Sequence, residues 1–335
     1  MEKRACGNTG LALPVLGVGV WAFGGGADDY WGSQDDRDAA AVVERALALG
    51  ANYFDTAEMY NLGRSESALG RALAGRRAQA LIGSKLSPSH ATSPEAVRQH
   101  CEATLARLGT EYVDLYMVHW PLPEDVVEPT FATLMQLQAE GKIRHIGVSN
   151  FGVQQMTAAL ATGVTLAVNQ LPYSLLARAI EHEILPFCAA HGIGVIGYMP
   201  LMQGLLAGKY RSADEMPPGL TRTRHFRPDR PDSRHGEPGA EAETFALVEG
   251  LRQIAAREGA PMAQLALAWA AANPAMTCVL AGARNTGQLE ENVAGATRRL
   301  SPALKAELDA LSAAVMAKLG ANVDLWHPAE RSRTR

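Results

Sequence analysis

Short apolar runs alternate with segments of helical spacing along most of this chain. The runs are apolar along their whole length, as in strands that a parallel sheet buries on both faces. Between them, apolar residues recur three and four positions apart, which is the spacing of one helix face. The expected strands are 14–19, 52–54, 80–85, 112–118, 143–148, 166–170, 193–198 and 277–280. The expected helices are 35–49, 65–73, 93–108, 128–140, 153–161, 178–191, 241–257, 262–271, 286–294 and 302–318.

Eight strands that alternate with helices predict a (β/α)₈ (TIM) barrel. A short β-hairpin around 7–10 precedes the barrel, and the helix at 302–318 is an extra C-terminal one. Composition does not shift along the chain, so we expect one domain over 1–335, with a long loop at 202–239 and a tail at 319–335. The alternative is an open doubly wound sheet, but the glycines at 24–26 lack the nucleotide-binding spacing which that fold wants after its first strand.

Three successive strands end in a single ionisable residue. Asp55 ends the second strand and is followed five residues later by Tyr60, Lys85 ends the third, and His119 follows the fourth. The carboxyl ends of barrel strands meet at one rim, where TIM barrels have their active sites. We therefore expect these four side chains to converge on a catalytic centre.

The four residue types suit proton transfer to a carbonyl oxygen. A tyrosine has an unperturbed pKa of about 10, so Tyr60 needs a cation beside it to stabilise its phenolate. Lys85 could supply that cation, Asp55 could keep Lys85 charged, and His119 could orient the substrate oxygen. Because protein side chains contain no hydride donor, a nicotinamide or flavin is required.

The remaining strand ends suit the binding of such a cofactor. Ser149, Asn150 and Gln170 offer hydroxyl and amide groups, and Tyr198 offers an aromatic face. After the eighth strand, Arg284 precedes a helix whose N-terminus would suit a phosphate.

Composition narrows the function classes. Hydrophobic residues make up 47% of the chain and charged residues 20%, and the net charge is -4, which gives no bulk attraction to nucleic acid or an anionic membrane surface. The start lacks an apolar signal core, and no run approaches the roughly 20 apolar residues of a spanning helix. We expect a cytoplasmic protein with a small-molecule carbonyl substrate and no nucleic-acid or membrane partner. The cysteines show no paired spacing, so neither a metal site nor a disulfide framework is expected at Cys6, Cys101, Cys188 and Cys278.

From position 7 to about 311 the chain resembles the aldo-keto reductase superfamily. The motifs that carry the resemblance are Asp55-Thr-Ala-Glu-Met-Tyr60, Gly83-Ser-Lys85, Val118-His-Trp-Pro121, Gly147-Val-Ser-Asn-Phe151, Tyr198-Met-Pro-Leu201, Gly204-Leu-Leu-Ala-Gly-Lys-Tyr210 and Gly282-Ala-Arg-Asn with Gln288-Leu-Glu-Glu-Asn292. The resemblance implies a bacterial NADPH-dependent oxidoreductase. Asp55, Tyr60, Lys85 and His119 match the catalytic four of the family, with Tyr60 as general acid.

The resemblance also implies a set of cofactor contacts. Ser149, Asn150 and Gln170 match the contacts to the carboxamide, and Tyr198 matches the aromatic that stacks on the nicotinamide. The full set is Trp21, Ser149, Asn150, Gln170, Tyr198, Pro200, Leu201, Gly204, Lys209, Arg222, Gly282, Arg284, Gln288, Glu291 and Asn292.

Within that set, Lys209 and Arg222 match side chains over the pyrophosphate, and Arg284 matches the contact to the adenosine 2′-phosphate, which implies NADPH. Gly282 stands where some branches of the family carry a lysine for that phosphate. The preference for NADPH therefore depends mainly on Arg284, and NADH is possible.

Several segments allow more than one interpretation. Trp21, Trp31 and Trp120 either line a substrate pocket for apolar carbonyl compounds or pack the barrel mouth. The arginine-rich segment 221–234 is a connecting loop, a lid over the cofactor phosphates or a subunit contact. In the tail, 325–326 could fold over the pocket or dock on a partner subunit, and 331–335 is expected to be disordered.

The leading function is NADPH-dependent reduction of an aldehyde or ketone. The alternatives are an NAD(P)⁺-dependent aldose or alcohol dehydrogenase, a cofactor-sensing regulatory subunit like the potassium-channel β subunits of this superfamily, and an aldolase with a Schiff base on Lys85. The sequence leaves the substrate and the oligomeric state open.

Overall fold

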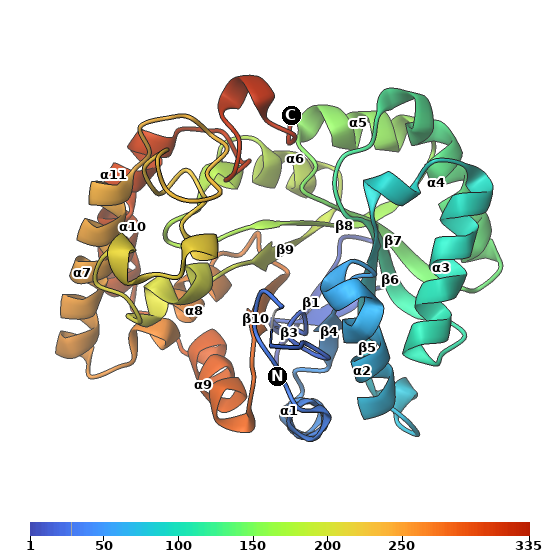
Figure 1. The fold of residues 1–335 in the computed structure, drawn as a ribbon, viewed down its shortest axis with the longest axis horizontal. Coiled ribbons are helices and arrows are strands. Elements are labelled where there is room, and N and C mark those ends of the chain that lie inside the picture. Colours follow the sequence, from blue (N-terminus) through green and yellow to red (C-terminus); the bar gives the residue numbers. More distant parts are fainter. Residues whose placement is uncertain (28) are drawn as a thin grey trace.

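Eight parallel strands form a closed barrel in the computed structural model, which describes residues 1–27 and 29–335 (Figure 1). The strands are β3 (Leu16–Gly19), β4 (Tyr53–Asp55), β5 (Leu81–Leu86), β6 (Val113–Val118), β7 (Ile143–Ser149), β8 (Leu166–Pro172), β9 (Gly194–Tyr198) and β10 (Cys278–Gly282). β10 pairs with both β9 and β3 and so closes the ring. The predicted barrel and all eight strands are confirmed.

The predicted hairpin is also present, ahead of the barrel. β1 (Lys3–Ala5) and β2 (Ala12–Pro14) pair antiparallel. Leu11 and Leu13 are buried in one apolar cluster with Leu115 and Val168 of the barrel strands, so the hairpin closes the end opposite the strand carboxyl ends. Gly7 has φ +55, and its backbone runs against the Gly192 carbonyl so closely that a Cβ there would collide.

The helices surround the barrel, and most lie where the periodicity predicts (Figure 1). They are α1 (Asp36–Leu49), α2 (Arg64–Ala72), α3 (Pro94–Leu108), α4 (Glu124–Ala139), α5 (Val153–Ala161), α6 (Ile184–Ala190), α7 (Glu241–Glu258), α8 (Met262–Ala271), α9 (Thr286–Thr297), α10 (Pro302–Leu311) and α11 (Ala313–Leu319). α4 begins four residues before its expected start at 128 and continues through Pro129.

Two expected helices are interrupted. The segment expected over 178–191 is a 3₁₀ turn, Ala179–Glu181, followed by α6. The segment expected over 302–318 breaks at Ser312, whose hydroxyl donates to the Asp309 carbonyl at 3.0 Å and accepts from Arg178 at 2.6 Å. Serine hydroxyls that bind nearby backbone compete with helical hydrogen bonds, which explains a break that apolar periodicity does not reveal.

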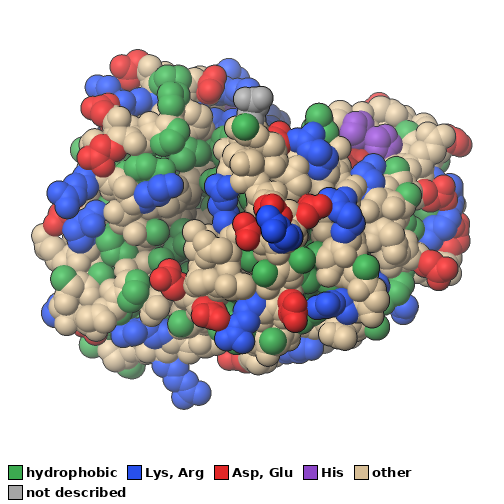
Figure 2. Space-filling view, turned by 60° about the horizontal axis from the view of Figure 1, so that its bottom comes forward, with side chains coloured by type: hydrophobic (Ala, Val, Ile, Leu, Met, Phe, Trp, Pro, Cys, Tyr) green, Lys and Arg blue, Asp and Glu red, His purple; other side chains and the backbone are tan. Residues whose placement is uncertain are grey.

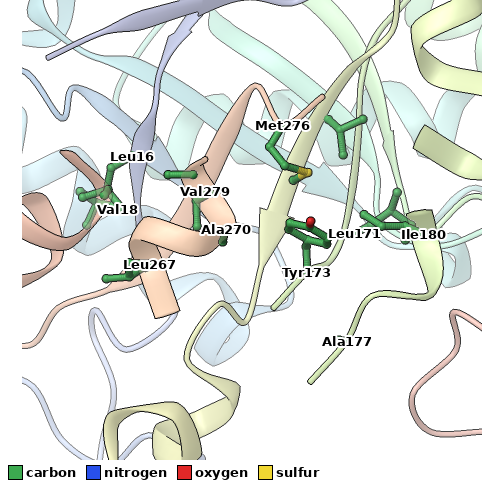
Figure 3. Packing of buried hydrophobic residues seen from close by; sticks show 14 of the residues in the cluster. Leu16, Val18, Leu171, Tyr173, Ala177, Ile180, Leu267, Ala270, Met276 and Val279 are labelled. Atoms are coloured by element: carbon green, nitrogen blue, oxygen red, sulfur yellow. The ribbon is translucent and has the colours of Figure 1, made fainter. Parts of the chain in front are cut away.

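The main core lies between the outer side of the barrel and the helices. In Figure 3, Leu16 and Val18 of β3 and Val279 of β10 lie near Leu267 and Ala270 of α8. These side chains are at most 1% exposed. Full burial of an aliphatic side chain of this size contributes roughly 1.5–3 kcal/mol, so the strands are held in place mainly by this layer.

The arginine-rich segment 221–234 is fixed to its surroundings by ion pairs. Arg224 is 4% exposed, and it pairs with Glu237 at 2.7 Å and donates to two backbone carbonyls near the end of α11. Arg230 pairs with Glu241, the first residue of α7, at 2.6 Å. Much of the positive charge of the segment is therefore neutralised within this protein.

The C-terminal tail is ordered, so the predicted disorder of 331–335 is wrong. Thr334 is buried, and its hydroxyl donates to the Asn150 carbonyl at 2.8 Å. Arg335 accepts the Gln154 N–H at 3.0 Å at the start of α5, beside which the chain ends in Figure 1. The first N–H groups of a helix have no acceptor within the helix, so α5 gains a hydrogen-bond partner from the backbone of Arg335. The sequence of 331–335 is short and basic, and it gives no indication of these partners, which lie far away along the chain.

The surface carries both signs of charge. On the face displayed in Figure 2, lysine and arginine side chains are interspersed with aspartate and glutamate. All four cysteines are buried and carry free thiols. No helix among the described residues combines the length and apolar character needed to cross a bilayer.

Replacing Thr334 by Val should lower the free energy of unfolding by about 1 kcal/mol, because the buried hydrogen bond to the Asn150 carbonyl is lost while the side-chain shape is kept. Equilibrium urea denaturation measures this change. Thr157→Val is the matched control, since Thr157 is exposed on α5 and its hydroxyl contacts only its own helix. Equal stabilities of the two variants would contradict the structural role of the tail.

Candidate active site

The four predicted catalytic side chains meet at the carboxyl ends of β4, β5 and β6. Strand pairing places Asp55 opposite Gly83 and Lys85 opposite Met117, which brings the ends of the three strands into one layer. The Lys85 Nζ lies 2.6 Å from Asp55 Oδ2 and 3.3 Å from the Tyr60 hydroxyl.

Lys85 is fully buried and has three acceptors. Besides Asp55 and Tyr60, its Nζ donates to the Thr56 carbonyl at 2.8 Å. An ammonium group has three N–H donors, so all three are used. Burial lowers the pKa of Lys85, and the Asp55 carboxylate opposes that shift. The three acceptors thus hold the Lys85 ammonium beside the Tyr60 hydroxyl.

Asp55 is held by a residue that the sequence assigns to the cofactor. Its Oδ2 accepts from Lys85, and its Oδ1 accepts from Gln170 Nε2 at 2.7 Å. Gln170 was expected to contact the nicotinamide carboxamide. In the structure its amide group also fixes the orientation of the Asp55 carboxylate.

Tyr60 is a neutral phenol. Burial raises the pKa of Tyr60 well above its usual value, and the Asp55 charge adds to the shift. The cation expected beside Tyr60 is present, 3.3 Å from its hydroxyl, while burial and the Asp55 charge favour the neutral phenol. Tyr60 therefore retains its proton until an acceptor is placed beside it, and Lys85 can stabilise the phenolate that then forms.

His119 lies beside the phenol and is also neutral. The centroids of its ring and the Tyr60 ring are 5.7 Å apart, in an edge arrangement. Burial, reinforced by the Lys85 charge, lowers the pKa of His119 to about 3. The sequence left its protonation open; the structure gives a neutral imidazole with one N–H to donate.

The segment that carries Tyr60 is fixed by a residue that sequence reasoning missed. Asn61 and Leu62 both have left-handed backbone, with φ 50 and 56. The Asn61 Nδ2 donates to the carbonyls of Trp21 and Phe23 at 2.8 and 2.9 Å. Asparagine is enriched at left-handed positions, so its place directly after Tyr60 was the available signal.

Aromatic rings border the catalytic centre on the side of the loop after β3. The Trp21 ring stacks on Tyr60 at 4.9 Å and on Tyr30 at 5.2 Å. Trp31 meets the edges of Trp21 and Tyr30. The structure thus places Trp21 and Trp31 together near Tyr60, and adds Tyr30, which the sequence analysis did not single out.

Trp120 lies under the tail. The Arg333 guanidinium is 3.7 Å from the centre of its ring, and Trp326 packs against it edge-on at 5.8 Å. Asp324 fixes that guanidinium with an ion pair at 2.7 Å. Of the two interpretations of 325–326, the structure shows the tail folded onto the rim next to His119.

The residues predicted to bind the carboxamide form one hydrogen-bonded network across the ends of β7, β8 and β9. The Tyr198 hydroxyl donates to Asn150 Oδ1 at 2.7 Å, and Asn150 Nδ2 donates to the His119 carbonyl at 3.0 Å. The Ser149 hydroxyl donates to the Gln170 carbonyl at 3.0 Å. The network joins this part of the rim directly to the residues around Tyr60.

Three cations predicted to bind phosphates surround the rest of the rim. Arg284 donates to the carbonyls of Trp31 and Ser33, and the Arg222 guanidinium lies 5.1 Å from the Tyr30 ring centre. Within 1–27 and 29–335, no carboxylate lies within ion-pair distance of Arg222, Arg284 or Lys209.

The donor set fits an anionic dinucleotide. The Arg222 Nε is buried and has no hydrogen-bond partner among the described residues. A buried unpaired donor is costly, and a phosphate oxygen would satisfy it. The segment after β9 is also strained, since Met199, Met202 and Gln203 all have left-handed backbone. Such strain is found mostly at functional sites.

The other predicted cofactor residues lie along the same edge. Asn292 is buried and donates to the Gly282 carbonyl at 3.0 Å, so it also holds α9 to β10. Gln288 accepts the Arg284 N–H at 2.9 Å. Glu291 is exposed in the middle of α9. Beyond β9, Gly204 has φ +101, a conformation that favours glycine, in the segment that includes Pro200 and Leu201.

Comparison with known proteins gives a consistent result. The model of the Aldo/keto reductase family matches residues 15–313. Aldo-keto reductase YhdN of Bacillus subtilis is 34% identical over 305 residues, which are 87% of each chain. The NADH-specific methylglyoxal reductase of Escherichia coli is 33% identical over 90% of this chain and 96% of its own.

A solved structure agrees with these relatives. The aldo-keto reductase from Klebsiella pneumoniae in complex with NADPH superposes with a TM-score of 0.72 at 30% identity, covering 93% of this chain and 96% of that one. The barrel, the four converging side chains and these matches lead to one conclusion: this chain belongs to the aldo/keto reductase family.

Proposed function

We propose that this protein reduces an aldehyde or ketone to an alcohol with NADPH, and that Tyr60 donates the proton. Family membership makes the chain an NAD(P)H-dependent oxidoreductase, and the catalytic roles are our proposal. The observation that carries them is the fully buried Lys85, whose Nζ bridges Asp55 at 2.6 Å and Tyr60 at 3.3 Å.

The four side chains divide the work of proton transfer. His119, a neutral donor, would hold the substrate oxygen near the Tyr60 hydroxyl. As the oxygen gains negative charge it takes the Tyr60 proton, and the phenolate left behind is stabilised by the Lys85 ammonium. Asp55 keeps that ammonium charged and in place. Bound NADPH would supply the hydride.

The rim suggests which residues would hold the cofactor. Ser149 and Asn150 would bind the carboxamide, and the Tyr198 ring would contact the nicotinamide. Lys209 and Arg222 would neutralise the pyrophosphate, and Arg284 the 2′-phosphate. The Klebsiella pneumoniae relative binds NADPH, while the Escherichia coli relative is named as NADH-specific, so NADH is a second possible donor.

The surroundings of the centre favour apolar carbonyl substrates. Trp21 and Trp31 lie on one side of it, and Trp120, with the tail folded against it, lies next to His119. An aldose or alcohol dehydrogenase would use the same residues in reverse. It would need Tyr60 as a base, and a raised pKa makes the phenolate scarce at neutral pH. An aldolase would need a free amine, whereas Lys85 is an engaged ammonium.

Replacing Tyr60 by Phe should lower kcat/KM for carbonyl reduction by about 10²–10⁴-fold, because the proton donor is lost. Fluorescence titration should show cofactor binding retained, since the aromatic ring remains. Tyr112→Phe, which alters a hydroxyl at the opposite end of the barrel beside Arg77, should behave like wild type. A Tyr60→Phe variant with near wild-type turnover would remove Tyr60 from its role.

The pH dependence of reduction should have only an alkaline limb. His119, with its pKa lowered to about 3, stays neutral, so it gives no loss of activity between pH 5 and 8. Tyr60 is protonated over that range because its pKa is raised. Activity should fall only at higher pH, as Tyr60 or Lys85 loses its proton. Initial rates at constant ionic strength test this; a limb near pH 6–7 would show that His119 titrates.

Replacing Arg284 by Ala should raise the KM for NADPH by about 10–100-fold, as expected for the loss of a charge-assisted contact of roughly 1.5–3 kcal/mol. The KM for NADH should change little, since that cofactor has no 2′-phosphate. Arg45→Ala, which removes a surface ion pair between α1 and Glu290 of α9, is the control. If the KM for NADPH and the KM for NADH rise equally, Arg284 acts only by holding the loop at 31–33 through its hydrogen bonds to the carbonyls there.

A further inference from the structure

A second polar cluster lies beside the catalytic centre and takes no part in the proposed reaction. Glu58 stands between Asp55 and Tyr60, and its side chain is only 4% exposed. The Nδ1 of His90 lies 2.9 Å from its Oε1, and the Nδ1 of His100 lies 2.7 Å from its Oε2. Two imidazoles thus share one buried carboxylate.

The three side chains come from separate elements. Glu58 follows β4, His90 ends the 3₁₀ turn Pro88–His90 after β5, and His100 is on α3. One ligand atom from each lies within 4.8 Å of the other two. A tetrahedral zinc ion has nitrogen and oxygen ligands at about 2.0–2.2 Å, so its ligand atoms are roughly 3.3 Å apart. The two hydrogen-bonded separations, 2.9 and 2.7 Å, are about half an ångström shorter than that, and all three ligand atoms lie within 4.8 Å of one another.

We propose that Glu58, His90 and His100 bind a divalent transition-metal ion of the Zn²⁺ class. A carboxylate accepts hydrogen bonds only, so both imidazoles now carry their proton on Nδ1. On binding, each Nδ1 gives up that proton, to Nε2 or to solvent, and its lone pair goes to the metal, so the protons balance. Two imidazoles disfavour Mg²⁺ and Ca²⁺, which prefer oxygen ligands.

The site is open enough to admit an ion. The imidazoles of His90 and His100 are 34% and 33% exposed, which leaves a coordination position for water. Their rings are stacked, with centroids 3.9 Å apart and planes 17° apart. A metal cannot lie in the planes of two stacked rings, so one ring must turn on binding, and a side chain exposed to this degree can do so.

The same carboxylate links the cluster to the catalytic segments. Glu58 Oε1 also accepts the Ser87 N–H at 2.7 Å. Ser87 follows Lys85 by two residues, and Glu58 precedes Tyr60 by two. A metal that binds the Glu58 carboxylate would therefore shift both segments that position the Lys85–Tyr60 contact. This coupling rests on the proposed function, whereas metal binding does not.

The sequence pattern predicts no metal site, because it offers no paired cysteines and because Glu58 lies far from His90 and His100 along the chain. Only the packing of α3 against the loops after β4 and β5 brings the three ligands together.

Calorimetric titration of the chelator-treated full chain with Zn²⁺ tests the site. We expect one ion bound per chain, and affinity at least about tenfold weaker in the His90→Gln/His100→Gln double variant. Glutamine can still donate an amide N–H to Glu58, so the variant should fold. His182→Gln changes an exposed histidine elsewhere and should bind as wild type. Absence of saturable binding, or equal affinity in the double variant, would overturn the proposal.

A turnover assay tests the coupling separately. Saturating Zn²⁺ should lower carbonyl reduction at least about twofold in wild type and His182→Gln but not in the double variant. Zn²⁺ binding with unchanged wild-type turnover would disprove the coupling. A protein that reduces no carbonyl compound at all would refute the proposed function and leave the binding result intact.

Discussion

The active site depends on one buried charge. Placing an ammonium where water cannot reach costs several kcal/mol unless acceptors compensate for its lost hydration. Lys85 has three: the Asp55 carboxylate, the Thr56 carbonyl and the Tyr60 hydroxyl. Each of these lies on β4 or just after it, so the charge ties β5 to the segment that carries the proton donor. Gln170 extends the arrangement to β8 through the second oxygen of Asp55.

Around this centre the barrel serves as a rigid base, and loops from distant parts of the chain are tied together above it. Asn61 holds the turn after Tyr60 to the loop after β3. Tyr30 joins that loop to the segment after β9 through Gln203, and Thr334 joins the tail to Asn150. Most of these contacts between loops are side-chain hydrogen bonds to backbone carbonyls. The rim is therefore organised before any substrate arrives, which limits the entropy lost on binding.

Electrostatic conditions differ around the rim. Near Tyr60, burial keeps the phenol and the imidazole neutral beside the charged pair of Asp55 and Lys85. Further along, Arg222 and Arg284 interact with aromatic faces and carbonyls, which leaves their charge available to an anion. On the outer side, Glu58 links two histidines to the segment between Asp55 and Tyr60. One short segment thus connects the catalytic centre with the proposed metal site.

The sequence by itself determined the barrel, because apolar runs buried on both faces and helices of regular spacing are local patterns. It also predicted that the candidate catalytic side chains converge, since parallel strands direct their carboxyl ends to one rim and Asp55, Lys85 and His119 each stand at such an end. It could not determine which groups would meet across the fold. The order of the tail, the bond from Gln170 to Asp55, the raised pKa of Tyr60 and the cluster around Glu58 all follow from burial and from contacts between distant segments. Those quantities exist only once the chain is packed, because desolvation and hydrogen-bond geometry depend on every neighbour in space.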